Sequence, residues 1–212
     1  MKQETKIAIL GGGGRTGKYI VSQLLNQGYS LTLLLRKPED FQLINSRLSV
    51  IKGDAINKED IHSLLKGCHV IISTIGQRPG EPLVASCATA NILEAMAQYG
   101  ISRYILVAGL NIDTPFDRKG SETIAATEWM KTKFPEVQED RQKTYTYLLH
   151  SDTQWTLVRV PLIEFTEAKR NVAVDLEDCP GTRISAGNIA NFIIEQLDKD
   201  TYVRKSPFIA DI

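Results

Sequence analysis

The chain has 212 residues, and its 25 lysine and arginine residues balance its 25 aspartate and glutamate residues, so the formal net charge is zero. Nucleic acid or an anionic membrane usually calls for a basic excess, and we therefore expect neither as a partner. The length suits one α/β domain, spanning residues 1–212, with room for a sizeable core.

Other features of the composition favour a cytoplasmic protein. The segment 1–5 is short and polar, so no signal peptide is expected, and no apolar run approaches the length of a bilayer span. The cysteines are scattered without a C-x-x-C pair, which favours reduced and mostly buried thiols: Cys68, Cys87 and Cys179. The histidines are too dispersed to predict a metal site: His62, His69 and His150.

Apolar runs alternate with helical patterns from end to end, which is typical of a parallel sheet covered on both faces. Strands are expected at 7–10, 29–35, 48–52, 69–75, 103–107 and 155–160, with a possible edge strand at 206–210. Helices are expected at 17–28, 57–67, 83–99, 139–150 and 189–197. The pattern predicts a Rossmann-like, doubly wound α/β fold with strand order 3-2-1-4-5-6. It loosens between the fifth strand and residue 140, where we expect a substrate loop region at about 110–140.

Four consecutive glycines separate the first strand from the first helix. Gly11, Gly14 and Gly17 read as G-x-x-G-x-x-G. Glycines allow the backbone to approach a pyrophosphate, and the free N–H groups of a helix N-terminus favour negative charge. The arrangement indicates a nucleotide site, whereas the plainer interpretation is a flexible turn.

A P-loop is a second interpretation of the same residues. Gly12 to Lys18 matches G-x-x-x-x-G-K, but Tyr19 follows where a serine or threonine hydroxyl should reach magnesium. This departure argues against a nucleoside triphosphatase.

The end of the second strand bears on the choice of cofactor. A binder selective for NAD usually places an acidic residue there, but this chain has Arg36, nineteen residues past Gly17. A guanidinium binds the extra 2′-phosphate of NADP in a bidentate manner, so we predict NADP(H) as the cofactor. The alternative is an ordinary solvated charge at a strand end.

Gly11-Gly-Gly-Gly-Arg-Thr-Gly17 resembles the G-A-T-G-x-T-G turn of the atypical short-chain dehydrogenases. That group includes the NmrA-like regulators and the biliverdin-IXβ/flavin reductases. Further matches are Leu33 to Arg36, Gly53-Asp54, Ile75-Gly76, and Asp152 to Pro161, which is similar to S-G-L-x-W-T-I-V-R-P. The resemblance covers nearly the whole chain and is specific to the superfamily, not to one reaction.

The resemblance implies a set of cofactor contacts, taken position by position. The pyrophosphate would be held by the residues of the turn: Gly11, Gly14, Arg15, Thr16 and Gly17. Arg36 would hold the 2′-phosphate, and Asp54 and Ala55 would border the adenine, although Asp54 is also a plausible turn residue after Gly53. Along the rest of the cofactor the implied neighbours are Ile75 and Gly76 below the ribose and Pro161 and Leu162 near the nicotinamide.

The chain departs from the dehydrogenases in its catalytic half. No tyrosine is followed four residues later by lysine; Val137 and Arg141 stand at those two positions, and the serine after the fifth strand is replaced by Ala108 or Gly109. The usual proton-transfer apparatus is therefore missing. Among side chains expected at the crevice, Asn111 and Arg141 are the candidate catalytic residues, with surface or salt-bridge roles as the alternative.

These features predict an NADPH-dependent reductase of a small flat or carbonyl-bearing acceptor, of flavin or quinone type, by direct hydride transfer. The alternative is a redox sensor or regulator of NmrA type that binds NADP(H) without turnover. A sugar-nucleotide epimerase ranks below both, because it needs the Tyr-Lys pair. We expect a monomer or a homodimer with a small-molecule acceptor.

Overall fold

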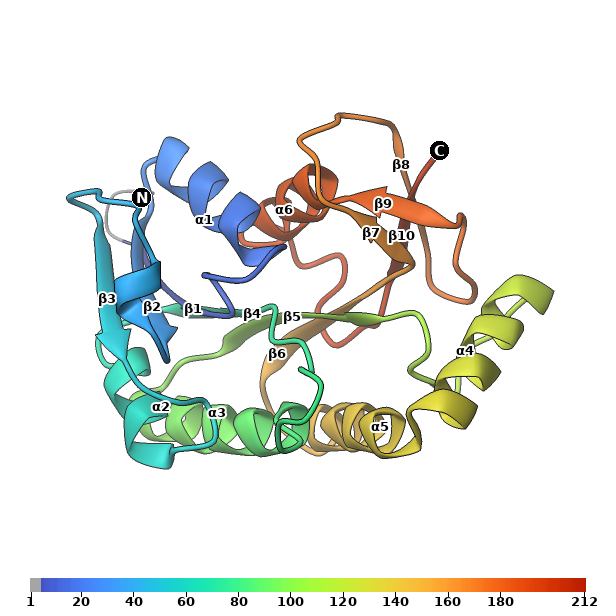
Figure 1. Cartoon of the computed structure of the whole chain (residues 1–212), viewed down its shortest axis with the longest axis horizontal. Helices are drawn as coiled ribbons and strands as arrows, with labels where there is room; N and C mark the ends of the chain where they lie inside the picture. Colours follow the sequence, from blue (N-terminus) through green and yellow to red (C-terminus); the bar gives the residue numbers. More distant parts are fainter. Residues whose placement is uncertain (1–4) are drawn as a thin grey trace.

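Eight strands form one sheet, in the order β3-β2-β1-β4-β5-β6-β10-β8 (Figure 1). The structure is a computed structural model that describes residues 5–212. Every neighbouring pair is parallel except β10 and β8. In sheet order, the strands are β3 (Leu48–Lys52), β2 (Ser30–Leu35), β1 (Lys6–Leu10), β4 (Val70–Ser73), β5 (Arg103–Gly109), β6 (Gln154–Val160), β10 (Phe208–Asp211) and β8 (Val172–Asp175). The predicted Rossmann-like α/β fold and the order of its first six strands are confirmed.

Helices cover both faces of the sheet. One face carries α1, Gly17–Asn26, and α6, Ala186–Glu195, which contact each other. The other face carries α2, α3 and α5, with bounds Lys58–Leu65, Ala85–Tyr99 and Pro135–Leu149. The remaining helix α4, Ser121–Lys133, contacts α5 and lies beyond the end of the helical layer (Figure 1). A short 3₁₀ helix, Pro38–Asp40, follows β2.

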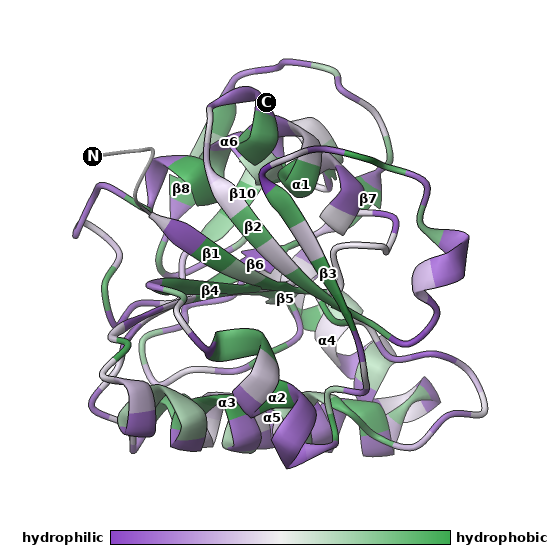
Figure 2. Cartoon of the chain, turned by 90° about the vertical axis from the view of Figure 1, so that its left-hand side faces the viewer, coloured by the Kyte–Doolittle hydropathy of each residue, from purple (hydrophilic) through white to green (hydrophobic). Residues whose placement is uncertain are grey.

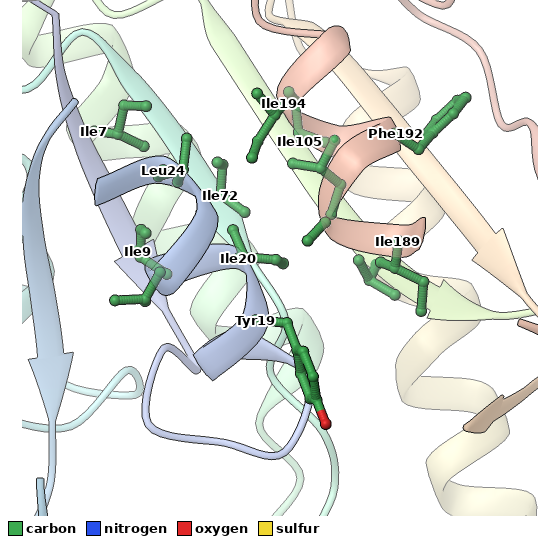
Figure 3. Close-up of a cluster of buried hydrophobic side chains, with 14 of the residues drawn as sticks. Ile7, Ile9, Tyr19, Ile20, Leu24, Ile72, Ile105, Ile189, Phe192 and Ile194 are labelled. Carbon is green, nitrogen blue, oxygen red and sulfur yellow. The ribbon is translucent and has the colours of Figure 1, made fainter. Parts of the chain in front are cut away.

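The sheet separates two hydrophobic cores because alternate residues of a strand point to opposite faces. In β1, Ile7 and Ile9 belong to the core below α1 and α6, whereas Ala8 and Leu10 belong to the core below α2, α3 and α5. Figure 3 shows the first core, where side chains of β1, β4 and β5 meet those of the two helices. In Figure 2 much of the sheet is green, whereas helices α2, α3 and α5 alternate between green and purple, as expected of helices with one buried and one exposed face.

The start of α2 is fixed by side-chain hydrogen bonds. Asn57 caps α2, since its Oδ1 accepts hydrogen bonds from the backbone N–H groups of Glu59 at 2.9 Å and Asp60 at 3.4 Å. The carboxylate of Asp60 does not complete a capping box. It instead accepts the backbone N–H of Asp54 at 2.8 Å, which ties the start of α2 to the turn after β3.

The C-terminal third differs most from the expected pattern. The strand at Phe208–Asp211 lies inside the sheet, because β8 pairs with its other side and takes the edge. Two more short strands, β7 at Leu162–Glu164 and β9 at Arg183–Ser185, form a separate parallel pair.

The region expected to be a substrate loop, at about 110–140, includes the start of a helix. Pro135 is the first residue of α5, where its missing N–H costs nothing.

All three cysteines are free, but only one is buried. Cys68 is buried, Cys87 is exposed and Cys179 is intermediate, so the expectation of mostly buried thiols is wrong.

Among residues 5–212, no helix is long and apolar enough to span a bilayer. The same described residues contain no cluster of three or more His, Cys, Asp or Glu side chains that could hold a metal ion.

Candidate functional site

The residues singled out in the sequence gather at one edge of the sheet. Parallel strands place all their carboxyl ends at the same edge, and the strand order reverses between β1 and β4. In open α/β sheets, ligands bind in the crevice at such a switch point. The glycine turn follows β1 directly, and Thr74 to Gly76 follow β4, so both border this crevice.

The glycine turn is close-packed and requires glycine at specific places. Gly11 has a φ of +78°, and a Cβ there would lie 2.7 Å from Thr74 Oγ1. A Cβ at Gly17 would overlap the carbonyl group of Gly11. The N–H of Gly14 donates to the Gly11 carbonyl at 2.8 Å, so this amide is used within the turn. The turn is therefore a built structure and not a flexible linker.

The glycine turn is followed by the N-terminus of α1, whose first turn carries no negative charge. Thr16 is the N-cap of α1, its side chain makes no capping hydrogen bond, and the first turn of α1 contains no acidic residue. The first N–H groups of a helix attract anions through their partial positive charge. The arrangement is suited to a phosphate group above the glycines.

The glycine turn and the N-terminus of α1 form a cradle, and Thr74 packs against it. Thr74 is not among the residues that the sequence predicts for the site. Its backbone N–H donates to the Leu10 carbonyl at 3.0 Å, and its hydroxyl donates to the Gly11 carbonyl at 3.3 Å. These bonds fix the end of β4 against the glycine turn. Its position after the fourth strand is the only signal in the sequence that points to it.

Arg36 lies at the end of β2 and is paired. Its guanidinium binds the carboxylate of Glu81 in a bidentate manner, with Nη1–Oε2 at 2.8 Å and Nη2–Oε1 at 3.1 Å. The hydrogen bond to Glu81 is the main reason that the pKa of Arg36 is raised; the field of Asp54 adds to it. Arg36 and Asp54, the residues predicted at the adenosine end, are thus brought together, and Glu81 joins them.

Asp54 and Ala55 form the turn between β3 and α2. One carboxylate oxygen of Asp54 accepts the backbone N–H of Ile56 at 3.2 Å, which is the turn role considered for it from the sequence. Ala55 is buried, and its carbonyl accepts the Asn91 side-chain amide at 3.3 Å.

Arg141 reaches the crevice from α5. Its Nη2 donates to the Ile75 carbonyl at 2.5 Å, and burial lowers the pKa of its guanidinium. The guanidinium therefore holds the backbone at the end of β4. Next to it, Gly76 is exposed, and a Cβ on Gly76 would meet no atom within 4 Å.

Asn111 lies after β5 and is buried. Its side-chain amide donates to the Gln138 side-chain oxygen, and the Gln138 amide donates back to the Asn111 carbonyl at 2.8 Å. This reciprocal pair links the β5 loop to α5. Gln138 was not predicted, because a lone glutamine on a polar helix carries no recognisable pattern.

The chain after β6 supplies apolar surface to the site. Pro161 is buried, whereas Leu162 is 74% exposed at the start of β7. The guanidinium of Arg15 lies over the ring of Phe165, 4.4 Å from its centroid. This contact joins the glycine turn to the segment after β7.

A family model described as NAD(P)H-binding matches residues 11–200 of this chain. The chain belongs to the NAD(P)H-binding family. The isoflavone reductase homolog A622-like of Nicotiana tabacum is 27% identical over 158 residues, which are 70% of this chain and 49% of that protein. The chain thus spans about half the length of such curated relatives.

Solved structures share the fold over nearly all of this NAD(P)H-binding chain. A short-chain dehydrogenase/reductase from Veillonella parvula in complex with NADP has a TM-score of 0.80 at 18% identity, covering 98% of this chain and 94% of that one. ChuY, an anaerobillin reductase from Escherichia coli O157:H7, has a TM-score of 0.79 at 17% identity, covering 98% and 97%. The family model confirms the predicted NAD(P)-binding family, and the solved structures confirm the predicted fold.

The residues of this NAD(P)H-binding chain fit the cofactor. A Cβ on Gly11 or Gly17 would fill the cradle, and the N-terminus of α1 offers N–H groups with no acidic neighbour in its first turn. We predict that the pyrophosphate lies over Gly11 to Gly17 and the adenosine toward Arg36 and Asp54. The Gly14 N–H donates to the Gly11 carbonyl and the Arg15 guanidinium lies over the Phe165 ring, and the contacts of these two residues with the cofactor stay predictions.

Proposed function

We propose that the chain is an NADPH-dependent reductase that passes hydride directly to a small flat or carbonyl-bearing acceptor, of flavin or quinone type. One contrast carries the proposal: the close-packed glycine turn and the α1 N-terminus fit a dinucleotide, whereas the usual proton-transfer residues are replaced. Val137 stands at the expected tyrosine position, and Arg141 at the lysine position donates to the Ile75 carbonyl. Hydride transfer to an electron-poor ring depends on proximity more than on a dedicated acid.

The preference for NADP rests on Arg36. Its side chain is 42% exposed at the end of β2, so a ligand can reach its guanidinium. A planar guanidinium matches the geometry of a phosphate. When bound, the cofactor would supply the hydride, and the glycine turn and Arg36 would hold its phosphates.

An apolar rim supports a flat acceptor. Leu162 and Phe165 are 74% and 40% exposed in the segment that follows the predicted nicotinamide neighbour Pro161. Exposed apolar side chains beside a crevice are suited to stacking against a ring. The named activities of the relatives, isoflavone reductase homolog and anaerobillin reductase, are compatible with this class of reaction.

The test measures NADPH binding by fluorescence and NADPH oxidation by absorbance, with FMN and a panel of small quinones. Binding with acceptor-dependent turnover supports the reductase, and a primary isotope effect with NADPH deuterated at C4 would identify hydride transfer. Binding without turnover across the panel would instead support the NADP(H)-binding sensor. Absence of binding contradicts both functions.

A further inference from the structure

The loop at residues 76–84 crosses from β4 to α3 and is held at both ends by neighbouring residues of α5. Arg141 donates to the carbonyl of Ile75 at 2.5 Å, just before the loop. Asp140, 6% exposed, accepts the backbone N–H of Ala85 at 2.9 Å and of Ser86 at 3.0 Å, just after it. The two ends of this loop are therefore fixed relative to each other.

The middle of the loop is ordered by its own side chain. The amide of Gln77 donates to the carbonyls of Arg78 at 3.1 Å, Glu81 at 2.8 Å and Pro82 at 3.2 Å. Gly80 has a φ of +73°, a conformation that favours glycine, and makes the turn before Glu81. This folding presents the Glu81 carboxylate toward the end of β2.

The Glu81 carboxylate binds Arg36 in the same bidentate manner in which a phosphate binds a guanidinium. Both carboxylate oxygens bind the two terminal nitrogens of the guanidinium, at 2.8 and 3.1 Å. Arg78 adds a weaker ion pair to the same carboxylate at 3.7 Å. The Arg36 and Glu81 side chains are 42% and 38% exposed, so water and ligands reach the pair. A carboxylate and a phosphate compete for the same guanidinium edge, and their negative charges repel each other.

We propose that Glu81 is a specificity-determining residue: its carboxylate binds the guanidinium of Arg36, and the 2′-phosphate of NADP must displace it. The inference rests on the proposed role of Arg36 in holding that phosphate. Glu81 weakens binding of every 2′-phosphorylated ligand and leaves ligands without this phosphate unaffected. The loop middle moves on displacement, while its ends stay with α5.

The test compares two probes that differ only in the 2′-phosphate, adenosine 2′,5′-bisphosphate and 5′-AMP, by calorimetry at low salt. An exposed ion pair is worth at most about 1 kcal/mol, so E81Q and E81A should bind the bisphosphate about twofold to fivefold more tightly than the natural chain. Their affinity for 5′-AMP should be unchanged. The gain should shrink at high salt because screening weakens exposed charge pairs.

E39Q is the matched control. Glu39 is an exposed carboxylate three residues after Arg36, and no ion pair joins the two within the described residues. Its removal changes the net charge by the same amount as E81Q. An equal gain in E39Q would show a general charge effect and overturn the inference, as would an unchanged or weaker affinity of E81Q for the bisphosphate.

R36Q separates this inference from the proposed function. If R36Q abolishes the preference for the bisphosphate while E81Q changes nothing, Arg36 reads the phosphate and only the inference about Glu81 is wrong. If R36Q also changes nothing, the 2′-phosphate assignment is wrong and the inference falls with it. Hydrogen exchange gives a second readout: the bisphosphate, but not 5′-AMP, should speed exchange of amides at 77–84.

Discussion

Arg159 and Asp117 form a buried ion pair in which one guanidinium nitrogen donates to both carboxylate oxygens at 2.8 Å. Arg159 is fully buried in β6 and its guanidinium lies 3.5 Å from the centroid of the Phe208 ring. It also donates to the Ile112 carbonyl at 3.1 Å. The pair therefore holds the loop after β5 onto the sheet.

We expect D117N to lower the free energy of unfolding by about 3–5 kcal/mol, because it leaves a buried guanidinium without its carboxylate. Urea denaturation followed by circular dichroism measures this. The double variant D117N/R159M should recover part of the loss, since it removes the unpaired charge. A loss in D117N comparable to that of an exposed variant such as E122Q would contradict the assignment.

The glycine cradle offers a contrast between two alanine substitutions. G17A places a Cβ onto the Gly11 carbonyl, so we expect a loss of stability of about 1–3 kcal/mol together with loss of NADPH binding. G76A meets no atom within 4 Å, so its stability should change by less than about 0.5 kcal/mol. If the cofactor ribose lies against Gly76, G76A should still weaken NADPH binding. Thermal unfolding and fluorescence titration of both variants give the comparison.

Charge reversal at Arg36 should change cofactor preference. R36E replaces a phosphate partner by a repelling carboxylate, so we expect the ratio of NADPH to NADH affinity to fall by about tenfold or more, equivalent to at least about 1.4 kcal/mol. Titrations with the two dinucleotides measure the ratio. A ratio equal to that of the natural chain would mean that another group reads the phosphate.

The Arg36–Glu81 pair also has a signature in its titration. The hydrogen bond and charge of Arg36 hold the pKa of Glu81 below its ordinary value of 4.5. Because the pKa is lowered, the pair stabilises the fold at pH values above the ordinary pKa of 4.5. This contribution is lost as the pH falls through the lowered pKa. In R36Q, the pKa of Glu81 should rise toward 4.5, as seen by carboxyl-carbon NMR. An identical midpoint in both proteins would show that the pair does not form in solution.

The apolar rim should affect the acceptor more than the cofactor. L162A removes an exposed side chain at the predicted nicotinamide end, so we expect the KM for a quinone acceptor to rise about threefold to tenfold, with a smaller change in NADPH affinity. Ile44, which is 95% exposed in the connection after β2, provides the control variant I44A. Equal KM values for L162A and I44A would place the acceptor elsewhere.

Local signals in the sequence predict the cofactor half of the molecule. The apolar run before Gly11 and the spacing of the glycines belong to one short segment, and each later strand ends at a recognisable turn. Arg36 follows because its distance from Gly17 is set by one helix and one strand. Such features depend on neighbours in the sequence, and for this reason they could be placed without coordinates.

The remaining parts depend on contacts between distant residues. Glu81 pairs with Arg36 across 45 positions, and Gln138 pairs with Asn111 across 27. Neither partner lies in a periodic pattern. The strands β7 and β9 have three residues each, too few for an alternating pattern, and are stable only as a pair. Local sequence patterns do not predict these contacts, since they form only when the fold brings the loops at the sheet edge together.

Asp140 and Arg141 have a consequence for redesign of the molecule. Because adjacent residues of one helix grip both ends of the 76–84 loop, the span between these ends is constant. We expect the segment between them to accept grafted sequences of equal length without disturbing α5 or the sheet. The adenosine end could thus be given a new nucleotide preference by exchange of one surface segment.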